Sequence, residues 1–251
     1  MSSEAFYTPL APGRYLATEH AQGPWDPSMQ HLGPVTALIV HELGDSELEL
    51  SRLVVEIFAP VPVAELEVAT SVVRDGKRVQ CLEATVSSGG RPYVRATAWR
   101  IRTEQTPATP VGGPPPMPET SASSWLTTSF GYGRAMDWRF VSGSAVEPGP
   151  ATAWGRARIP LVKGFEPTPL ERLALFADSG NGISFALDFD SYLFANIDLT
   201  ISLFRMPVGE WICMDSATVI GPTGRGLTRT TLSDSLGEVG TATQTLFVGP
   251  R

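Results

Sequence analysis

The sequence is poor in the side chains that most often build disulfides and metal centres. Its 251 residues include only two cysteines, Cys81 and Cys213, and three histidines. Both cysteines lie within alternating, strand-like runs, and neither has a second cysteine or a histidine at a metal-ligand spacing. We therefore expect two buried free thiols, with no disulfide, no metal site and no chemical role for either cysteine.

Long apolar runs and an excess of positive charge are absent as well. The formal net charge is −7 and the isoelectric point is near 5.0, which argues against nucleic acid or an anionic membrane as a partner, because both favour a basic surface. The first residues, MSSEAFYTPLAPGRY, lack the basic and apolar blocks of a signal peptide. No run approaches the roughly 20 apolar residues that span a bilayer. We expect a globular, cytoplasmic protein.

Common catalytic and nucleotide-binding motifs are also missing. There is no GxSxG sequence for a serine nucleophile, and His41-Glu42 lacks the second histidine of a zinc peptidase helix. The run from Gly221 to Thr228 resembles a phosphate-binding loop, but Leu227 stands where a lysine is needed. Gly180-Asn181-Gly182 has no third glycine at the dinucleotide spacing and follows a predicted helix instead of a strand. We therefore expect no nucleotide cofactor.

The most informative feature that is present is an internal duplication. The stretch NIDLTISLFRMPVGEWI, residues 196–212, resembles LSRLVVEIFAPVPVAEL, which begins at Leu50, and each is an alternating strand that ends at a proline-marked bend. An offset of 145 residues places Pro62 on Pro207 and aligns four further pairs: Gly76 with Gly221, Leu82 with Leu227, Thr85 with Thr230, and Val94 with Val239. A repeat of this length predicts two fused copies of one small domain.

Each copy is predicted to hold one helix followed by an antiparallel meander, an α+β unit. In the first copy, a strand at 13–22 precedes an apolar helix with Pro34 in its first turn and Gly44 at its end. Four strands are then expected, at 48–59, 65–74, 77–87 and 92–102.

A proline-rich segment separates the two copies. Residues 103–122 contain six prolines and almost no apolar periodicity, which is typical of an extended linker. We expect a first domain at 1–106, a linker at 107–133 and a second domain at 134–251. In the second domain, Thr168-Pro169-Leu170-Glu171 forms a capping box that starts a helix ending near Gly180.

Three polar residues stand where the pattern expects apolar ones. Gln244 shares a strand face with apolar residues, and the offset of 145 places it on Trp99 of the first copy. A buried amide needs partners, which the backbone or a dimer partner could supply. Asp178 lies in the last helical turn, where the macrodipole disfavours a carboxylate, although an exposed acid would be unremarkable there. Asn196 opens the duplicated strand on the face of Thr200, where exposure at an edge would explain it.

Three segments together resemble the C-terminal half of the acyl-CoA thioesterase II family: ALFADSGNGIS, FANIDLTISLFR and GTATQTLFV. The resemblance extends over the whole chain except the linker. It implies a double hotdog, that is, two fused antiparallel sheets each wrapping a central helix. It also implies a fatty acyl-CoA or related acyl thioester as substrate, a role in lipid metabolism and no cofactor. Together with the open edges of such sheets, it suggests a homodimer.

The resemblance assigns the catalytic residues, which lie in the second domain. The family uses an aspartate, a hydroxyl residue and a glutamine to orient a water, and these positions fall on Asp178, Asn196 and Gln244. Asparagine in place of the hydroxyl is a departure, and Thr200 is the alternative hydroxyl. Gly33 is the residue whose N–H would stabilise the oxyanion. The expected reaction is hydrolysis of an acyl thioester by water that a carboxylate activates.

Two other functions stay open. The departure at Asn196 is also compatible with a catalytically weak or inactive protein of the same fold that binds acyl thioesters. A hotdog hydratase is disfavoured, because such enzymes carry an aspartate–histidine pair in one motif and the corresponding stretch here, FDSYLFANID, has no histidine.

Overall fold

The computed structural model describes residues 4–120 and 125–251, so residues 1–3 of the predicted first domain and 121–124 of the predicted linker lie outside it. The first half of the chain contains six strands, one α-helix and one 3-10 turn among the described residues. In chain order these are β1 (Tyr7–Ala11), β2 (Arg14–Ala17), η1 (Glu19–Ala21), α1 (Leu32–Leu43), β3 (Leu48–Ile57), β4 (Glu65–Asp75), β5 (Val79–Ser88) and β6 (Arg91–Arg102).

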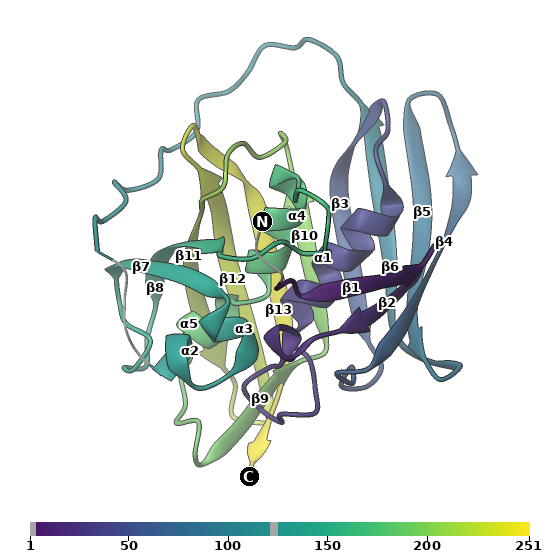
Figure 1. The fold of residues 1–251 in the computed structure, drawn as a ribbon. Helices are drawn as coiled ribbons and strands as arrows, with labels where there is room; N and C mark the ends of the chain where they lie inside the picture. The colour runs from purple at the N-terminus through teal and green to yellow at the C-terminus, as the bar shows by residue number, and fades with distance from the viewer. Residues whose placement is uncertain (1–3, 121–124) are drawn as a thin grey trace.

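The second half repeats this plan with additions. Its elements are α2 (Trp125–Thr128), α3 (Gly131–Arg134), β7 (Met136–Ser142), β8 (Ala151–Ala157), α4 (Pro169–Ala177), α5 (Gly180–Ile183), β9 (Tyr192–Asn196), β10 (Asp198–Leu203), β11 (Ile212–Ile220), β12 (Arg225–Asp234) and β13 (Gly237–Pro250). The short helix α2 falls within the predicted linker, and α3 ends one residue beyond it. Residues 103–120 form a long irregular arc (Figure 1).

All the strands of the described residues belong to one antiparallel sheet. Its order is β1-β2-β4-β5-β6-β3-β10-β13-β12-β11-β8-β7, and β9 pairs with β13. The sequence leads us to expect two sheets, but β3 and β10 join the halves through a ladder that places Leu53 opposite Ile201. An unpaired strand edge leaves N–H and C=O groups without partners, and this ladder satisfies them for both halves.

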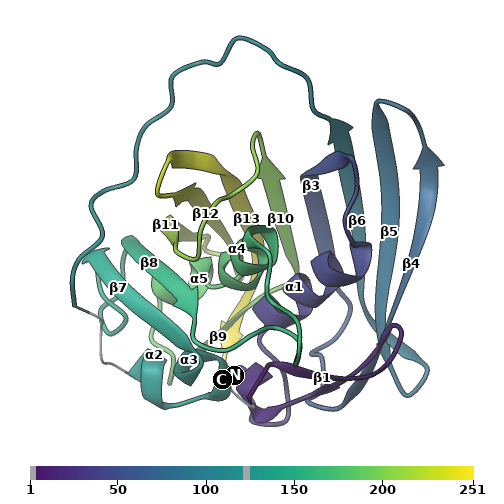
Figure 2. The same ribbon diagram turned by 45° about the horizontal axis from the view of Figure 1, so that its top comes forward.

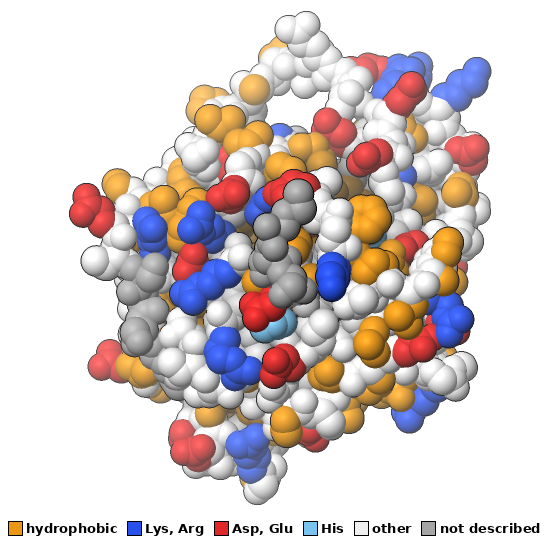
Figure 3. Space-filling view, in the orientation of Figure 1, with side chains coloured by type: hydrophobic (Ala, Val, Ile, Leu, Met, Phe, Trp, Pro, Cys, Tyr) orange, Lys and Arg blue, Asp and Glu red, His pale blue; other side chains and the backbone are white. Residues whose placement is uncertain are grey.

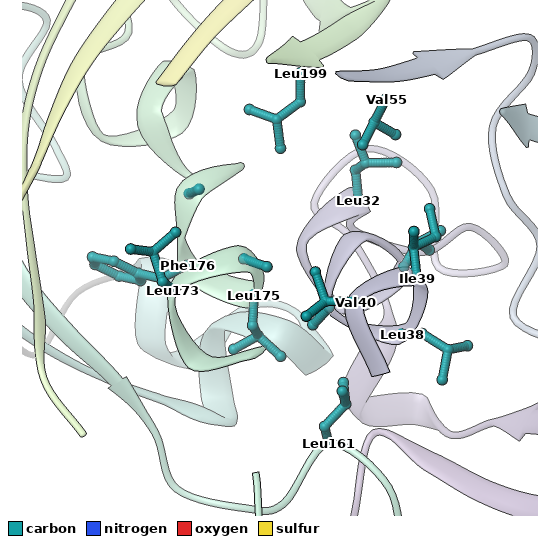
Figure 4. Close-up of a cluster of buried hydrophobic side chains, with 14 of the residues drawn as sticks. Leu32, Leu38, Ile39, Val40, Val55, Leu161, Leu173, Leu175, Phe176 and Leu199 are labelled. Atoms are coloured by element: carbon teal, nitrogen blue, oxygen red, sulfur yellow. The ribbon is translucent and has the colours of Figure 1, made fainter. Parts of the chain in front are cut away.

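The helices α1 and α4 lie side by side within the curve of this sheet (Figure 2). They run antiparallel, because the first turn of α1 meets the end of α4 and His41 near the end of α1 contacts Glu171 at the start of α4. A Cβ atom on Gly33 would lie 2.2 Å from the carbonyl oxygen of Leu175, so only glycine permits this close approach. Figure 4 shows Val40 and Leu175 facing each other between the two helices.

Most predicted elements of the first copy are confirmed. The four strands after the helix correspond to β3–β6 with ends shifted by one or two residues, and Pro34 does lie in the first turn of α1. The capping box at Thr168 and Glu171 is present, with both of its hydrogen bonds. The predicted strand at 13–22 was too long, because the chain leaves β2 after Ala17 and turns through η1.

The structure corrects the register of the internal repeat by one residue. In the first half Leu82 pairs with Ala98, and the equivalent pair in the second half is Thr228 with Gln244, so equivalent positions in these ladders lie 146 residues apart. Gln244 therefore corresponds to Ala98, which is buried like Gln244, and not to Trp99. The offset of 145 was anchored on prolines in loops, and a slip of one residue turns every side chain to the other face of a sheet.

The two cysteines are placed as the sequence predicts. Cys81 and Cys213 are free and buried, and burial raises the pKa of Cys213 to about 12. On the face shown in Figure 3, acidic and basic side chains are interspersed. Asp137 forms ion pairs with Arg156 and Arg158. Among the described residues, no helix is long and apolar enough to cross a bilayer.

Candidate active site

The structure brings Asp178, Asn196 and Gln244 together. Asp178 follows the last turn of α4, Asn196 ends β9 and Gln244 lies in the middle of β13. The side-chain amide of Asn196 donates from Nδ2 to Asp178 Oδ1 at 2.9 Å. Gln244 Nε2 donates to the same oxygen at 3.1 Å and to the backbone carbonyl of Asp178 at 3.0 Å. One carboxylate oxygen therefore accepts hydrogen bonds from two amides.

Gln244 is only 1% exposed, and both ends of its amide have partners. Its Oε1 accepts from the backbone N–H of Asn181, in α5, at 3.0 Å. A Cβ atom on Gly180 would lie 3.0 Å from this oxygen and 2.6 Å from the Thr230 hydroxyl, so the glycine lets α5 approach β13. Gln244 thus links β13 to Asp178 at the end of α4 and to Asn181 in α5. Most of the hydrogen-bond partners of its buried amide are backbone groups.

Asn196 belongs to β9 and does not open the strand that carries Thr200. The pairing with β13 shifts by one residue at Ile197. Asn196 on β9 lies opposite Leu246 of β13, whereas Thr200 on β10 lies opposite Thr243 of β13. On β10 the buried side chains are those of Leu199 and its alternate neighbours, so Thr200 points to the opposite, outer face. The structure therefore does not bring Thr200 to Asp178.

His31 is a fourth residue of this cluster, and the sequence reasoning missed it. It is the N-cap of α1, and its Nδ1 lies 3.1 Å from Asp178 Oδ2. Burial lowers the pKa of His31, and the nearby Asp178 carboxylate only partly opposes this effect. The imidazole is therefore neutral near pH 7. A polar residue directly before the first turn of the predicted helix was the available signal, because that position caps a helix.

Gly33 lies beside this cluster, with its N–H already engaged. It donates to His31 Nδ1 at 3.0 Å, which is the capping hydrogen bond of α1. In this arrangement the N–H of Gly33 is directed at the histidine ring and does not point freely into the site.

Tyr132, from α3, supports both His31 and the end of α4. Its ring stacks on His31 with centroids 3.9 Å apart and planes at 6°. Its hydroxyl donates to the carbonyl of Leu175 at 3.0 Å and lies 2.8 Å from the hydroxyl of Ser179. Burial raises the pKa of Tyr132, so the phenol stays neutral. These contacts fix the positions of the histidine and the aspartate relative to each other.

A cavity of about 500 Å³ opens next to the cluster, between the two halves of the chain. Asp178, Asn196 and His31 line it, whereas Gln244 stays behind the wall. Most of the wall is apolar, with aromatic side chains that include Trp25, Phe58, Phe130, Phe189 and Phe194. Such a site can hold an apolar chain and present a polar atom of its ligand to the carboxylate.

Family models match both halves of the chain. Residues 21–101 match the acyl-CoA thioesterase N-terminal domain, and residues 104–248 match the acyl-CoA thioesterase C-terminal domain. Among curated proteins, none matches the sequence.

Solved structures with low sequence identity share the fold over nearly the full chain. One is a conserved protein of unknown function with a hot dog fold from Alicyclobacillus acidocaldarius, with a TM-score of 0.76, 15% identity and coverage of 94% of this chain and 92% of that one. The tesB protein of Mycobacterium avium subs paratuberculosis has a TM-score of 0.71, 14% identity and coverages of 97% and 96%. The acyl-CoA thioesterase II TesB2 of Mycobacterium marinum has a TM-score of 0.67, 15% identity and coverages of 93% and 96%. The chain therefore has a hotdog fold.

Proposed function

The chain belongs to the acyl-CoA thioesterase family, and from this premise we propose that it hydrolyses an acyl thioester to the free acid and a thiol at the Asp178 cluster. The observation that carries the proposal is the meeting of Asp178, Asn196 and Gln244, from three segments, beside an apolar cavity. The cavity suits an acyl chain, and acyl-CoA or a related carrier thioester is the substrate class that we propose.

In this proposal Asp178 is the general base. Its carboxylate takes a proton from a water, and the water oxygen attacks the thioester carbonyl carbon. The tetrahedral intermediate collapses with cleavage of the C–S bond, and the proton held by Asp178 returns to the departing thiolate. Gln244 and Asn196 hold the carboxylate by their hydrogen bonds, and Asn196, which lines the cavity, also faces the water. An amide N–H at position 196 thus replaces the hydroxyl of the family pattern.

We also propose that each half of the chain is one hotdog unit, so that the fold is a double hotdog whose two sheets have merged at β3 and β10. The units would span residues 1–106 and 134–251, with 107–133 as the linker. The equivalent pairings in the two ladders support this division.

The proposal is tested by replacing the base. Asp178→Asn should lower the kcat for acyl-CoA hydrolysis by about two to four orders of magnitude, because loss of a general base costs about this much. A thiol-release assay over acyl-CoAs of several chain lengths measures it. Asp75→Asn, an exposed aspartate at the end of β4, is the matched control and should leave kcat unchanged. Undiminished turnover in a folded Asp178→Asn variant would reject Asp178 as the base.

One observation favours a second candidate function. Asp178 Oδ1 already accepts two amide hydrogen bonds and Oδ2 faces His31, so few lone pairs are left to take a water proton. A protein that binds acyl thioesters without hydrolysing them is therefore the alternative. Calorimetric binding of an acyl-CoA without thiol release would favour this alternative. Loss of the conjugated double bond of an enoyl-CoA without thiol release would instead indicate hydration, which is tested because His31 contacts Asp178.

A further inference from the structure

The Asp178 cluster draws on both halves of the chain, and His31 is the part that the first half contributes. The aspartate is 4% exposed, and the groups that face it are His31 from the start of α1, Tyr132 from α3 and the amides of Asn196 and Gln244. Both amides donate to Oδ1, so His31 is the neighbour of Oδ2. The position of the second carboxylate oxygen therefore depends on the histidine.

His31 is held tightly enough to define that position. Its ring lies against Tyr132, and its Nδ1 lies 3.0 Å from the backbone nitrogen of Gly33 at the first turn of α1. Gly33 in turn packs against the backbone of Leu175, one helical turn before Asp178. The contact between ring and carboxylate is thus set by the packing of α1 on α4 and not by the flexibility of an exposed side chain.

The ring nitrogen at this contact can adapt to either protonation state of the carboxyl group. A neutral imidazole carries one proton, on Nδ1 or on Nε2. With the proton on Nδ1, the ring can donate to an ionised Oδ2, 3.1 Å away, and the N–H of Gly33 then loses its acceptor on the ring. With the proton on Nε2, the single lone pair of Nδ1 accepts the N–H of Gly33 and is shared with the proton of a protonated Oδ2.

We propose that His31 is a positioning residue for the reaction: through Nδ1 it keeps Oδ2 of Asp178 aligned both before and after the carboxylate takes its proton from water. This inference rests on the proposed function of Asp178 and adds that the reaction centre is assembled from both halves of the chain. The ring itself does not attack the substrate or receive the proton of the water.

Three substitutions separate this role from a purely structural one. His31→Ser keeps a helix-capping oxygen but has no group that reaches Asp178. His31→Phe keeps a ring against Tyr132 but has no polar atom. His31→Asn keeps both a capping oxygen and an amide that can place a donor or an acceptor near the position of Nδ1.

The expected result is a loss of kcat that the asparagine rescues. His31→Ser and His31→Phe should lower kcat by about tenfold to a hundredfold, the range for losing a hydrogen bond to a charged group, with KM within a factor of about two. His31→Asn should stay within about fivefold of the wild type. Wild-type kcat in the serine variant would overturn the proposal. Equal loss in the folded serine and asparagine variants would also overturn it, because a polar group placed near the position of Nδ1 would then not restore the alignment of Oδ2.

A titration that does not depend on turnover separates this inference from the proposed function. Nuclear magnetic resonance of the His31 ring should show a lower pKa in Asp178→Asn than in the wild type, because the carboxylate that raises it is removed. An unchanged pKa would overturn the coupling of His31 to Asp178. Absence of any thioester hydrolysis by the wild type would overturn the proposed function, whatever the titration shows.

Discussion

At the scale of single residues, Asn196 is the most informative position because it departs from the hydroxyl that the family resemblance implies. Its Nδ2 donates to Asp178 Oδ1 and, at 3.3 Å, to the backbone carbonyl of Asp198. Asn196→Ala removes both hydrogen bonds and should lower kcat about tenfold or more. Asn196→Thr restores the family hydroxyl and should preserve or raise kcat. Steady-state acyl-CoA hydrolysis measures both, and a threonine variant as slow as the alanine variant would contradict a catalytic position for residue 196.

The sequence could name some residues of the site but not all of them. Asp178, Asn196 and Gln244 were identified through short segments that resemble the family, and the structure places them in contact. Their catalytic roles stay predictions. His31 was missed because its partner is 147 positions away in the sequence (178 − 31), and no local pattern records a contact between the ends of two helices.

At the scale of elements, the antiparallel pair of α1 and α4 places a histidine at each end. His41 Nδ1 lies 2.7 Å from Glu171 Oε1, and the hydrogen bond to Glu171 raises the pKa of His41. Burial instead lowers the pKa of His31 at the other end. The contributions of His41 and His31 to the stability of the fold should therefore change with pH in opposite directions.

The sign of each response follows from the direction of its pKa shift. His41 binds its proton more tightly in the folded state, so its contribution to stability is fully present below the ordinary histidine pKa of 6.5 and is lost as pH rises through the raised pKa. His31 binds its proton less tightly when folded. Its contribution is present above 6.5 and is lost as pH falls through the lowered pKa.

A urea-unfolding comparison at about pH 5.5 and about pH 8.5 tests this difference. His41→Gln should lower the free energy of unfolding more at the acid pH, because the ionic contribution of the His41–Glu171 pair is present there. His31→Asn is the matched variant at the other end of the helix pair. It should lower the free energy of unfolding less at the acid pH than at the alkaline pH. The same change at both pH values for His41→Gln would contradict the raised pKa.

The order of elements was predictable, whereas their register was not. Hydrophobic alternation and turn residues located β3–β6, and the capping box located α4, because these signals are local. The register of the repeat was wrong by one residue, since loop prolines carry no information on how many residues a bulge or turn adds. β1 was missed because it pairs only at the outer end of the sheet and four of its five residues are not fully buried.

At the scale of the whole molecule, the halves are held together by much more than the chain between them. They share the β3–β10 ladder, the packing of α1 on α4 and the cavity that both line. The proline-rich segment before α2 touches the second half through single hydrogen bonds, such as that from Arg139 to the carbonyl of Pro118. The segment should therefore be dispensable as a covalent link once the protein has folded.

Cleavage at a protease site inserted after residue 106 tests this expectation. The two fragments should co-elute in size-exclusion chromatography and keep thioester hydrolysis close to that of the uncut protein, which serves as the control. Separation of the fragments without denaturant would contradict a shared core.

Light scattering on the uncut protein tests the homodimer that was predicted from the sequence. A single 26.9 kDa species would contradict that prediction.

The antiparallel helix pair has an evolutionary consequence. His41 and Asp178 each stand ten residues after the N-cap of their helix, so they occupy equivalent places at opposite ends of the pair. In a dimer of two identical subunits, any substitution at one end would appear at the other end as well. Fusion of two copies into one chain removes that constraint. If Asp178 is the base, one end could then exchange its carboxylate for an ion pair that joins the helices, while selection for activity acted on the other end alone.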